Sequence, residues 1–286
     1  MNRHCFTSAF AHFVLAGFGI AASIAQAHEF WLTPLRADPP AHTTLGVVAN
    51  VGEYFRGDAV PFTAERIASI FVHSASGARN IGERFPSALS LAALPVAIGA
   101  PGTYIVAYDT TPSFLELDGG RFNAYLHDEG LDPIVRYREL GGAALALGRE
   151  RYRRSVKTIV NADGRCDATW STATGQRIEI VPQSDPCAAA PGATLSFQLL
   201  FDASPLPGHL AKAWFRRDGQ TFVVRAIADE HGIVAFTLPF AGPWMVSTVR
   251  MIRADADAVD WDSWWASLTF DVAAHSPSTP PASVLN

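Results

Sequence analysis

The chain has 286 residues, of which 49% are hydrophobic, and its 22 basic and 27 acidic side chains give a formal net charge of −5 at pH 7. This balance excludes nucleic acid as an expected partner, because no basic patch is large enough to follow a phosphate backbone. The locally basic run at residues 149–154 is short and contains a glutamate, so we interpret it as a solvated face. Past the N-terminal segment no stretch reaches the ~18 consecutive apolar residues of a spanning helix, so we expect a protein that is not membrane-spanning.

Residues 1–27 have the pattern of a cleaved signal peptide. A single arginine gives the positive start, an apolar stretch follows, and Ala25-Gln26-Ala27 matches the small-residue motif after which signal peptidases cut. Cleavage there makes His28 the first residue of the mature chain. Phe30-Trp31-Leu32 follows as an apolar anchor that would hold this terminus against the folded body. We therefore expect a periplasmic protein.

Cysteine usage agrees with that compartment. Cys5 leaves with the predicted signal peptide, so Cys166 and Cys187 remain. Two cysteines in an oxidising compartment usually form a disulfide. Their spacing does not suit C-x-x-C redox chemistry, and two thiols alone do not make a zinc site. We interpret the pair as a structural disulfide.

Short β-rich segments punctuated by glycine and proline fill most of the mature chain. After an opening strand, we predict strands at residues 45–51, 67–73, 89–98, 103–108, 156–160, 177–182, 194–201, 211–216, 221–227, 233–237, 244–251 and 267–272. Strands of this length and spacing are typical of a β-sandwich rather than a βαβ fold.

Residues 123–154 break the strand pattern. Asp132-Pro133 has the form of a helix start, with an N-cap side chain followed by proline at the first helical position. Gly141-Gly142 interrupts this helix, and residues 143–147 are predicted to resume it. We expect one or two short helices inserted between β elements.

These elements predict a mainly β protein with two β-sandwich domains, prealbumin-like or immunoglobulin-like, and a short helical insertion. A short internal repeat supports two similar domains, because residues 96–106 and 236–246 each have a strand, a glycine turn and an aromatic residue opening the next strand. The predicted boundaries are 1–27 for the signal peptide, 28–165 and 166–273 for the two domains, and 274–286 for a Ser/Pro-rich disordered tail.

His28 is the first candidate metal ligand. An N-terminal histidine offers its α-amine and its imidazole together, and imidazole suits Ni, Cu, Zn and Co ions. Two donors do not complete a coordination shell, so further ligands are needed. His127, followed by Asp128-Glu129, and His231, preceded by Asp229-Glu230, are the candidates, although histidines on surface loops are usually only solvated.

Three tryptophans near the C-terminus, Trp261, Trp264 and Trp265, have two interpretations. Exposed in a row, they would stack on sugar rings. In β proteins, tryptophan more often fills a core or a domain interface, and we favour this packing role.

Several segments together resemble the bacterial secreted family catalogued as domain of unknown function 4198. The matching segments are residues 27–32, 122–126, 150–157, 179–182, 205–208, 229–232 and 242–244. The resemblance implies a periplasmic, mostly β protein, and some relatives are similar to extracytoplasmic components of nickel and cobalt uptake systems. It implies no enzymatic activity. Glu29 stands where relatives often have aspartate, and the loop at 229–232 replaces a plainer Thr-Asp-x-x-Gly turn.

Three functions follow from these observations. The sequence favours a periplasmic binding or delivery protein for a divalent transition metal, Ni or Co in type, or else Cu or Zn, that serves a membrane transporter or a TonB-type receptor. The alternative is a β-sandwich interaction or carbohydrate-binding module without metal. A copper oxidase-like enzyme would need a second imidazole facing His28. We expect no enzyme, because H-E-x-x-H, G-x-S-x-G, P-loop and G-x-G-x-x-G motifs are absent.

Overall fold

The computed structural model describes residues 29–83, 85–255 and 258–274. In chain order its elements are β1 (Glu29–Pro34), β2 (Thr44–Glu53), β3 (Arg56–Val60), β4 (Phe62–Thr63), β5 (Ile67–Ser74), β6 (Gly77–Asn80), β7 (Ser90–Leu91), β8 (Leu94–Ala97), β9 (Gly102–Thr110), β10 (Ser113–Leu117), α1 (Gly119–Asp128), α2 (Asp132–Leu140), β11 (Gly148–Ala162), β12 (Ile178–Pro182), β13 (Ala193–Phe201), β14 (Ser204–Pro205), β15 (Leu210–Arg217), β16 (Gln220–Ile227), β17 (Ile233–Leu238), β18 (Gly242–Arg253) and β19 (Trp261–Val272).

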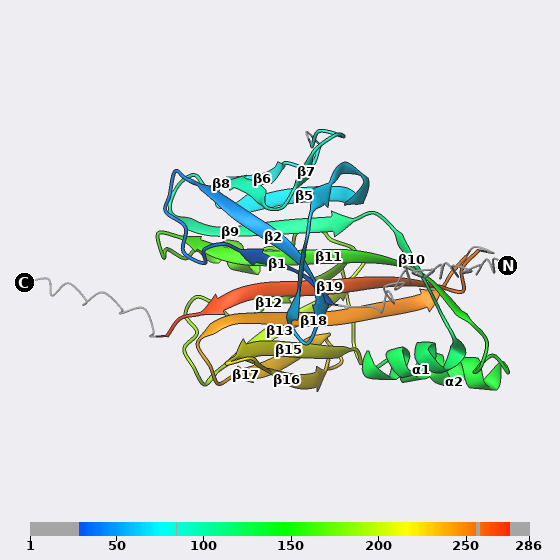
Figure 1. The fold of residues 1–286 in the computed structure, drawn as a ribbon. Coiled ribbons are helices and arrows are strands. Elements are labelled where there is room, and N and C mark those ends of the chain that lie inside the picture. The colour runs from blue at the N-terminus through cyan, green and yellow to red at the C-terminus, as the bar shows by residue number, and fades with distance from the viewer. Residues whose placement is uncertain (1–28, 84, 256–257, 275–286) are drawn as a thin grey trace, which may run out of the picture.

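One nine-stranded sheet runs through the molecule. Its strands follow the order β16-β15-β18-β19-β11-β9-β5-β6, and β10 pairs with the first part of β11. All neighbours are antiparallel except β11 and β19, which run parallel from the Glu150–Trp261 pair to the Thr158–Thr269 pair. Figure 1 shows these long strands side by side, with α1 and α2 near one end of β15 and β18. The parallel pair therefore joins the two halves of the chain in a single sheet.

Two smaller sheets cover the large one and make a sandwich with each of its halves. Strands β1, β2, β3 and β8 bury Leu32 and Val47 against residues such as Val106 of β9. Strands β12, β13, β14 and β17 bury Phe197 against residues such as Leu268 of β19. The predicted mainly β, sandwich-type fold is confirmed. The division into domains at residues 165 and 166 stays a prediction, since the large sheet belongs to both halves.

Alternation along the strands explains why they form where predicted. In β17, Val234, Phe236 and Leu238 are buried while the residues between them are exposed or half-buried, the period of two expected of a strand with one face on the core. The predicted strand at 89–98 is instead divided into β7 and β8.

Two strands begin earlier than predicted. Strand β11 starts at Gly148 rather than residue 156, and β19 at Trp261 rather than residue 267. Arginines of β11 pair there with aspartates 111 positions further along the chain, as in the contact of 2.6 Å between Arg151 Nε and Asp262 Oδ1. The basic run at 149–154 is therefore a paired strand and not simply a solvated face.

The helical insertion contains two short helices, as expected, with different boundaries. Helix α1 begins at Gly119, before the predicted residue 123. Asp118 caps it, since its side chain accepts a hydrogen bond from the Arg121 amide. Helix α2 has Leu131 at its N-cap, so Asp132 is its first residue and not its cap. Residues 143–147 form turns instead of helix. The buried Arg138 guanidinium donates to the Ala146 carbonyl at 2.7 Å, which holds this segment in place.

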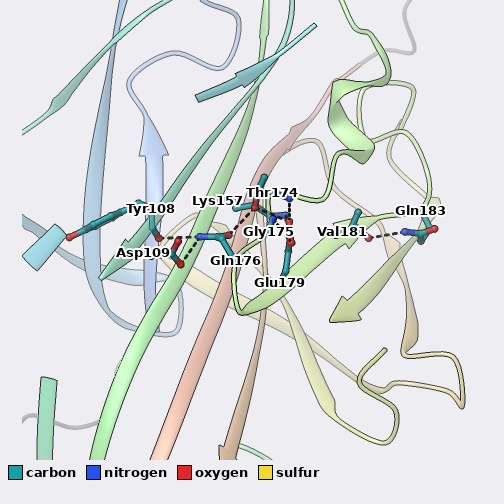
Figure 2. Close-up of polar contacts among 9 residues, drawn as sticks. All are labelled: Tyr108, Asp109, Lys157, Thr174, Gly175, Gln176, Glu179, Val181 and Gln183. Atoms are coloured by element: carbon teal, nitrogen blue, oxygen red, sulfur yellow. Dashed lines mark hydrogen bonds and ion pairs between the residues drawn. The ribbon is translucent and has the colours of Figure 1, made fainter. Parts of the chain in front are cut away.

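The segment between the two halves is fixed by polar contacts. The Cys166–Cys187 disulfide is present, with 6.4 Å between the Cα atoms. Nearby, Lys157 Nζ on β11 lies 2.7 Å from Glu179 Oε1 on β12, and both side chains are 2% exposed. The Thr174 and Gly175 amides also donate to Glu179. Figure 2 shows these groups gathered around the carboxylate.

Candidate metal site

Strand β1 is anchored along its length. Phe30, Trp31 and Leu32 are all buried, as the sequence predicts. Side-chain hydroxyls of β19 add to this: Ser267 Oγ donates to the Phe30 carbonyl and Thr269 Oγ1 to the Leu32 carbonyl, each at 2.7 Å. These contacts fix the backbone of β1 directly after Glu29.

Glu29 lines a small acidic pocket of about 60 Å³. Its lining residues come from β1, the end of β2, the β2–β3 turn, the C-terminal end of α1 with its cap, and β15: Glu29, Glu53, Tyr54, Tyr125, Asp128, Glu129 and Trp214. Four of the seven are carboxylic acids. This volume suits an ion with one or two water molecules rather than an organic ligand.

One buried lysine balances part of this negative charge. Lys212 Nζ of β15 donates to Glu129 Oε1 at 2.7 Å and lies 5.5 Å from the Trp214 ring centre. Burial raises the pKa of Glu29 to about 7, the Glu129 carboxylate adds to this rise, and Lys212 opposes it. Burial also raises the pKa of Glu129, although its contact with Lys212 acts to lower it. Lys212 therefore offsets only part of the negative charge around Glu29.

The β2–β3 turn forms one wall of the pocket in an unusual backbone conformation. Tyr54 and Phe55 have φ angles of 55° and 54°, the left-handed region that glycine and asparagine usually occupy in two-residue hairpins. Thr221 Oγ1 donates to the Tyr54 carbonyl at 2.6 Å, which ties the turn to β16. The Tyr54 ring faces Trp214, and the Phe55 ring packs edge-on against Trp31. Non-glycine residues in this conformation concentrate at functional sites.

The family match covers this region. Residues 25–251 match the family model described as Domain of unknown function (DUF4198). The chain belongs to the DUF4198 family. The predicted resemblance to this family is thus confirmed, while the likeness of some relatives to nickel and cobalt uptake components stays a prediction.

Other comparisons with the DUF4198 chain are distant. No curated protein matches its sequence. A tetra-tandem repeat in the extending region of a large adhesion protein is 10% identical over 87% of this chain and 50% of that chain, with a TM-score of 0.23. A Salmonella alpha-2-macroglobulin mutant is 9% identical over 91% of this chain and 16% of its own, with a TM-score of 0.21. This chain spans half or less of the length of both.

Of the three predicted metal ligands of the DUF4198 chain, His127 and His231 belong to no group of three or more possible metal ligands among the described residues. His28 lies outside them. His127 is in the last turn of α1, where its side chain is 78% exposed and its Nδ1 lies 2.5 Å from Asp132 Oδ1. His231 is 76% exposed, with Nε2 3.6 Å from Glu230 Oε1. Neither His127 nor His231 lines the acidic pocket. Their roles as ligands stay predictions.

Each predicted histidine segment has a different relation to the pocket. Asp128 and Glu129, named in the sequence as neighbours of His127, line it directly. At the other segment, Asp229 Oδ1 accepts the amides of His231 and Ile233 and thereby shapes a turn. Sequence reasoning missed Glu29 and Glu53 as lining residues. The position of Glu29 directly after His28 was the signal that could have found it.

The histidine, cysteine, aspartate and glutamate side chains of the described residues form no group of three or more that could hold a metal ion by themselves. No helix in the described ranges is long and apolar enough to cross a membrane. A metal site at this pocket therefore depends on donors from residue 28.

The tryptophans of β19 pack inside the DUF4198 fold. Trp261, Trp264 and Trp265 are 3%, 3% and 8% exposed, which agrees with the packing role favoured from the sequence. The Trp265 ring stacks on Tyr125 at 5.8 Å, so β19 supports the wall of the acidic pocket. These three rings offer no exposed platform for a sugar.

Behind Tyr125 lies a second buried acid, Glu150. Tyr125 Oη donates to Glu150 Oε1 at 3.2 Å, and Ser263 Oγ donates to the same oxygen. Glu150 Oε2 is buried and has no hydrogen-bond partner within the described ranges. Burial raises the pKa of Glu150 to about 7 against these hydrogen bonds. Part of the Glu150 population therefore stays protonated near neutral pH behind the pocket wall.

Proposed function

We propose that the protein binds a divalent transition-metal ion, of the Ni²⁺ or Co²⁺ type, at the N-terminus of its mature chain and delivers it in the periplasm. The observation that carries this proposal is the buried Glu29 in an acidic pocket with Glu129. Glu29 follows His28 directly. The α-amine and imidazole of a mature N-terminal His28 would therefore belong to the residue next to this carboxylate. Two nitrogen donors and nearby carboxylate oxygens form a donor set that suits such ions.

Electrostatics supports a cation at this position. The carboxylates of Glu29, Glu53 and Glu129 repel one another, which contributes to the raised pKa of Glu29. A divalent ion would remove that repulsion and favour the charged carboxylates. Lys212 already pairs with Glu129, so Glu29 is the carboxylate that a bound cation would contact. Binding would release protons because the imidazole, the amine and the carboxylates coordinate in their deprotonated forms.

A site built around a chain terminus suits delivery to a transporter or a TonB-type receptor. The ligands from residue 28 would stand beside the exposed Tyr54, where a partner could approach. The disulfide is typical of an exported protein, which supports a periplasmic location.

The test uses protein exported with its own leader, so that cleavage defines the terminus. Intact mass should correspond to a chain starting at His28, and titration calorimetry with Ni²⁺, Co²⁺, Cu²⁺ and Zn²⁺ should give one site per chain. We expect Glu29→Gln to weaken binding at least tenfold, which is about 1.4 kcal/mol. One alanine added before His28 should abolish the chelate, because the α-amine then belongs to another residue.

The matched control is Glu116→Gln, which removes an exposed carboxylate on β10 outside the pocket. It should leave the affinity unchanged. A mature mass that includes residues before His28 would contradict the proposal. The proposal would also be contradicted if the extended chain and Glu29→Gln both bound the metal ion as tightly as the unaltered protein.

A further inference from the structure

A second cavity lies where β1 crosses the parallel β11–β19 pair. Its volume is about 410 Å³, within the range of roughly 300–1,000 Å³ that is usual for small-molecule sites. Trp31 of β1, Phe55 of the β2–β3 turn and Phe270 of β19 line it with aromatic surface. It differs from the acidic pocket in size and lining, and the two share no lining residue.

Three arginines from separate elements line this cavity. Arg36 follows β1, Arg56 begins β3, and Arg216 lies near the end of β15. Arg36 is paired with Asp38 at 3.0 Å on the surface. Among the described residues, Arg56 and Arg216 have no ion pair, side-chain hydrogen bond or ring contact. Asp271 is the one acidic residue of the lining, so the cavity carries an excess of positive charge in a protein of net charge −5.

The lining also contains a buried hydroxyl without a partner. Thr158 of β11 is fully buried, and its Oγ1 has no hydrogen-bond partner within the described part of the chain. Its neighbour across the strand pair, Thr269, is satisfied because it donates to the Leu32 carbonyl. Buried polar groups are nearly always hydrogen-bonded, so an unpaired hydroxyl beside a cavity indicates a missing acceptor.

We propose that this cavity binds a small organic carboxylate that has a planar apolar body. The Arg56 and Arg216 guanidinium groups would hold the carboxylate, since their forked donors match its two oxygens. Leu35 and Phe55 would contact the apolar body, and Thr158 would donate to an oxygen of the ligand. The exposed Leu35 and the half-buried Phe55 give the lining apolar surface. This surface favours an organic anion over inorganic phosphate, because phosphate would leave it in contact with water.

The two pockets meet at the β2–β3 turn. Tyr54 lines the acidic pocket and Phe55 lines the arginine-lined cavity, although the two residues are adjacent. Their left-handed backbone conformation sends successive rings to Trp214 and to Trp31. The carboxylate site nevertheless uses no group of the metal proposal, so either can fail alone.

The experiment titrates the metal-free mature protein with benzoate, phthalate, uncharged benzamide and inorganic phosphate by calorimetry. Benzoate or phthalate should bind at one site with a Kd below about 1 mM. Benzamide and phosphate should bind at least tenfold more weakly. The double variant Arg56→Gln/Arg216→Gln should lose at least tenfold in carboxylate affinity. Arg136→Gln, an exposed arginine of α2, is the matched control and should bind as the unaltered protein does.

Thr158→Val separates a ligand contact from a structural role. The two side chains are nearly the same shape, and the hydroxyl has no described partner to lose, so the melting temperature should stay the same or rise. Carboxylate affinity should fall several-fold. The proposal is overturned if no carboxylate binds at millimolar concentration, if benzamide binds as tightly as benzoate, or if phosphate matches the aromatic carboxylates. It is also overturned if the double arginine variant binds unchanged.

Discussion

At the scale of single residues, Glu150 shows how burial sets the chemistry of a side chain. One of its oxygens accepts hydrogen bonds from Tyr125 and Ser263, and the other is buried without a described partner. The half-buried Arg154 lowers its pKa only partly. The carboxyl group therefore keeps its proton to a pKa of about 7, whereas in the unfolded chain it would lose the proton near 4.5.

This difference predicts the pH dependence of stability. Between pH 4.5 and about 7 the folded state binds more protons at Glu150 than the unfolded state, so the free energy of unfolding should fall as the pH rises through this range and then level off. Glu150→Gln keeps a neutral group and removes the titration. Thermal unfolding by circular dichroism between pH 5 and 8 should show a smaller decline for the variant, with the remainder including Glu29. Glu116→Gln should behave like the unaltered chain, and an equal decline in all three proteins would refute the assignment.

At the scale of elements, the β2–β3 turn has a strained backbone at Tyr54 and Phe55, and this backbone conformation allows their rings to contact Trp214 and Trp31. Left-handed conformations cost L-residues about 1–2 kcal/mol each, and aromatic residues lack the short polar side chain that lowers this cost in asparagine. Tyr54 is 58% exposed, so its ring contributes little burial to offset the strain. The turn is held by its surroundings, including Thr221 and the Trp31–Phe55 contact.

We expect Tyr54→Asn to raise the free energy of unfolding by up to about 1 kcal/mol, because asparagine adopts the left-handed region more readily. Tyr54→Ala removes the same ring without relieving the strain and should be neutral or destabilising. Urea unfolding of both variants measures the difference. If asparagine and alanine gave the same stability, backbone strain at this position would not be the cause.

At the scale of the whole molecule, the two halves are joined by the shared sheet and by the buried Lys157–Glu179 pair. Burial acts to raise the pKa of Glu179, but Lys157 and the hydrogen bonds from Thr174 outweigh it, so this pKa lies below its usual value. The pair therefore stabilises the fold above the pKa of an unfolded glutamate, and this stabilisation is lost as the pH falls through the lowered folded pKa.

Breaking this pair should cost far more than a surface ion pair. Lys157→Met leaves a buried carboxylate without its cation, and we expect a loss of about 3–5 kcal/mol in chemical denaturation. The double variant Lys157→Met/Glu179→Gln should lose less than the sum of the two single variants, since neither charge is then left alone. The exposed pair Arg177–Asp202 is the control, and Arg177→Met there should cost about 1 kcal/mol or less. Additive losses at positions 157 and 179 would mean that the two groups act independently.

The sequence by itself determined most strands, the disulfide and the packing of the β19 tryptophans. These features have local signals: alternation with a period of two, two cysteines that remain after the predicted signal peptide, and the tendency of large aromatic rings to be buried. It did not determine the early start of β11, because that stretch has alternating charges whose partners, such as Asp262, lie 111 positions away.

Only the tertiary structure decided how the halves join and where the pockets form. The parallel β11–β19 pair brings strands together that no local pattern relates, and β1 lies across their junction. The acidic pocket collects Glu29, Glu53 and Glu129 from three separate elements around Lys212. A sequence pattern reports the preference of neighbouring residues for a backbone shape and for burial. It cannot report which distant side chains will share a cavity, because that depends on how the sheets pack.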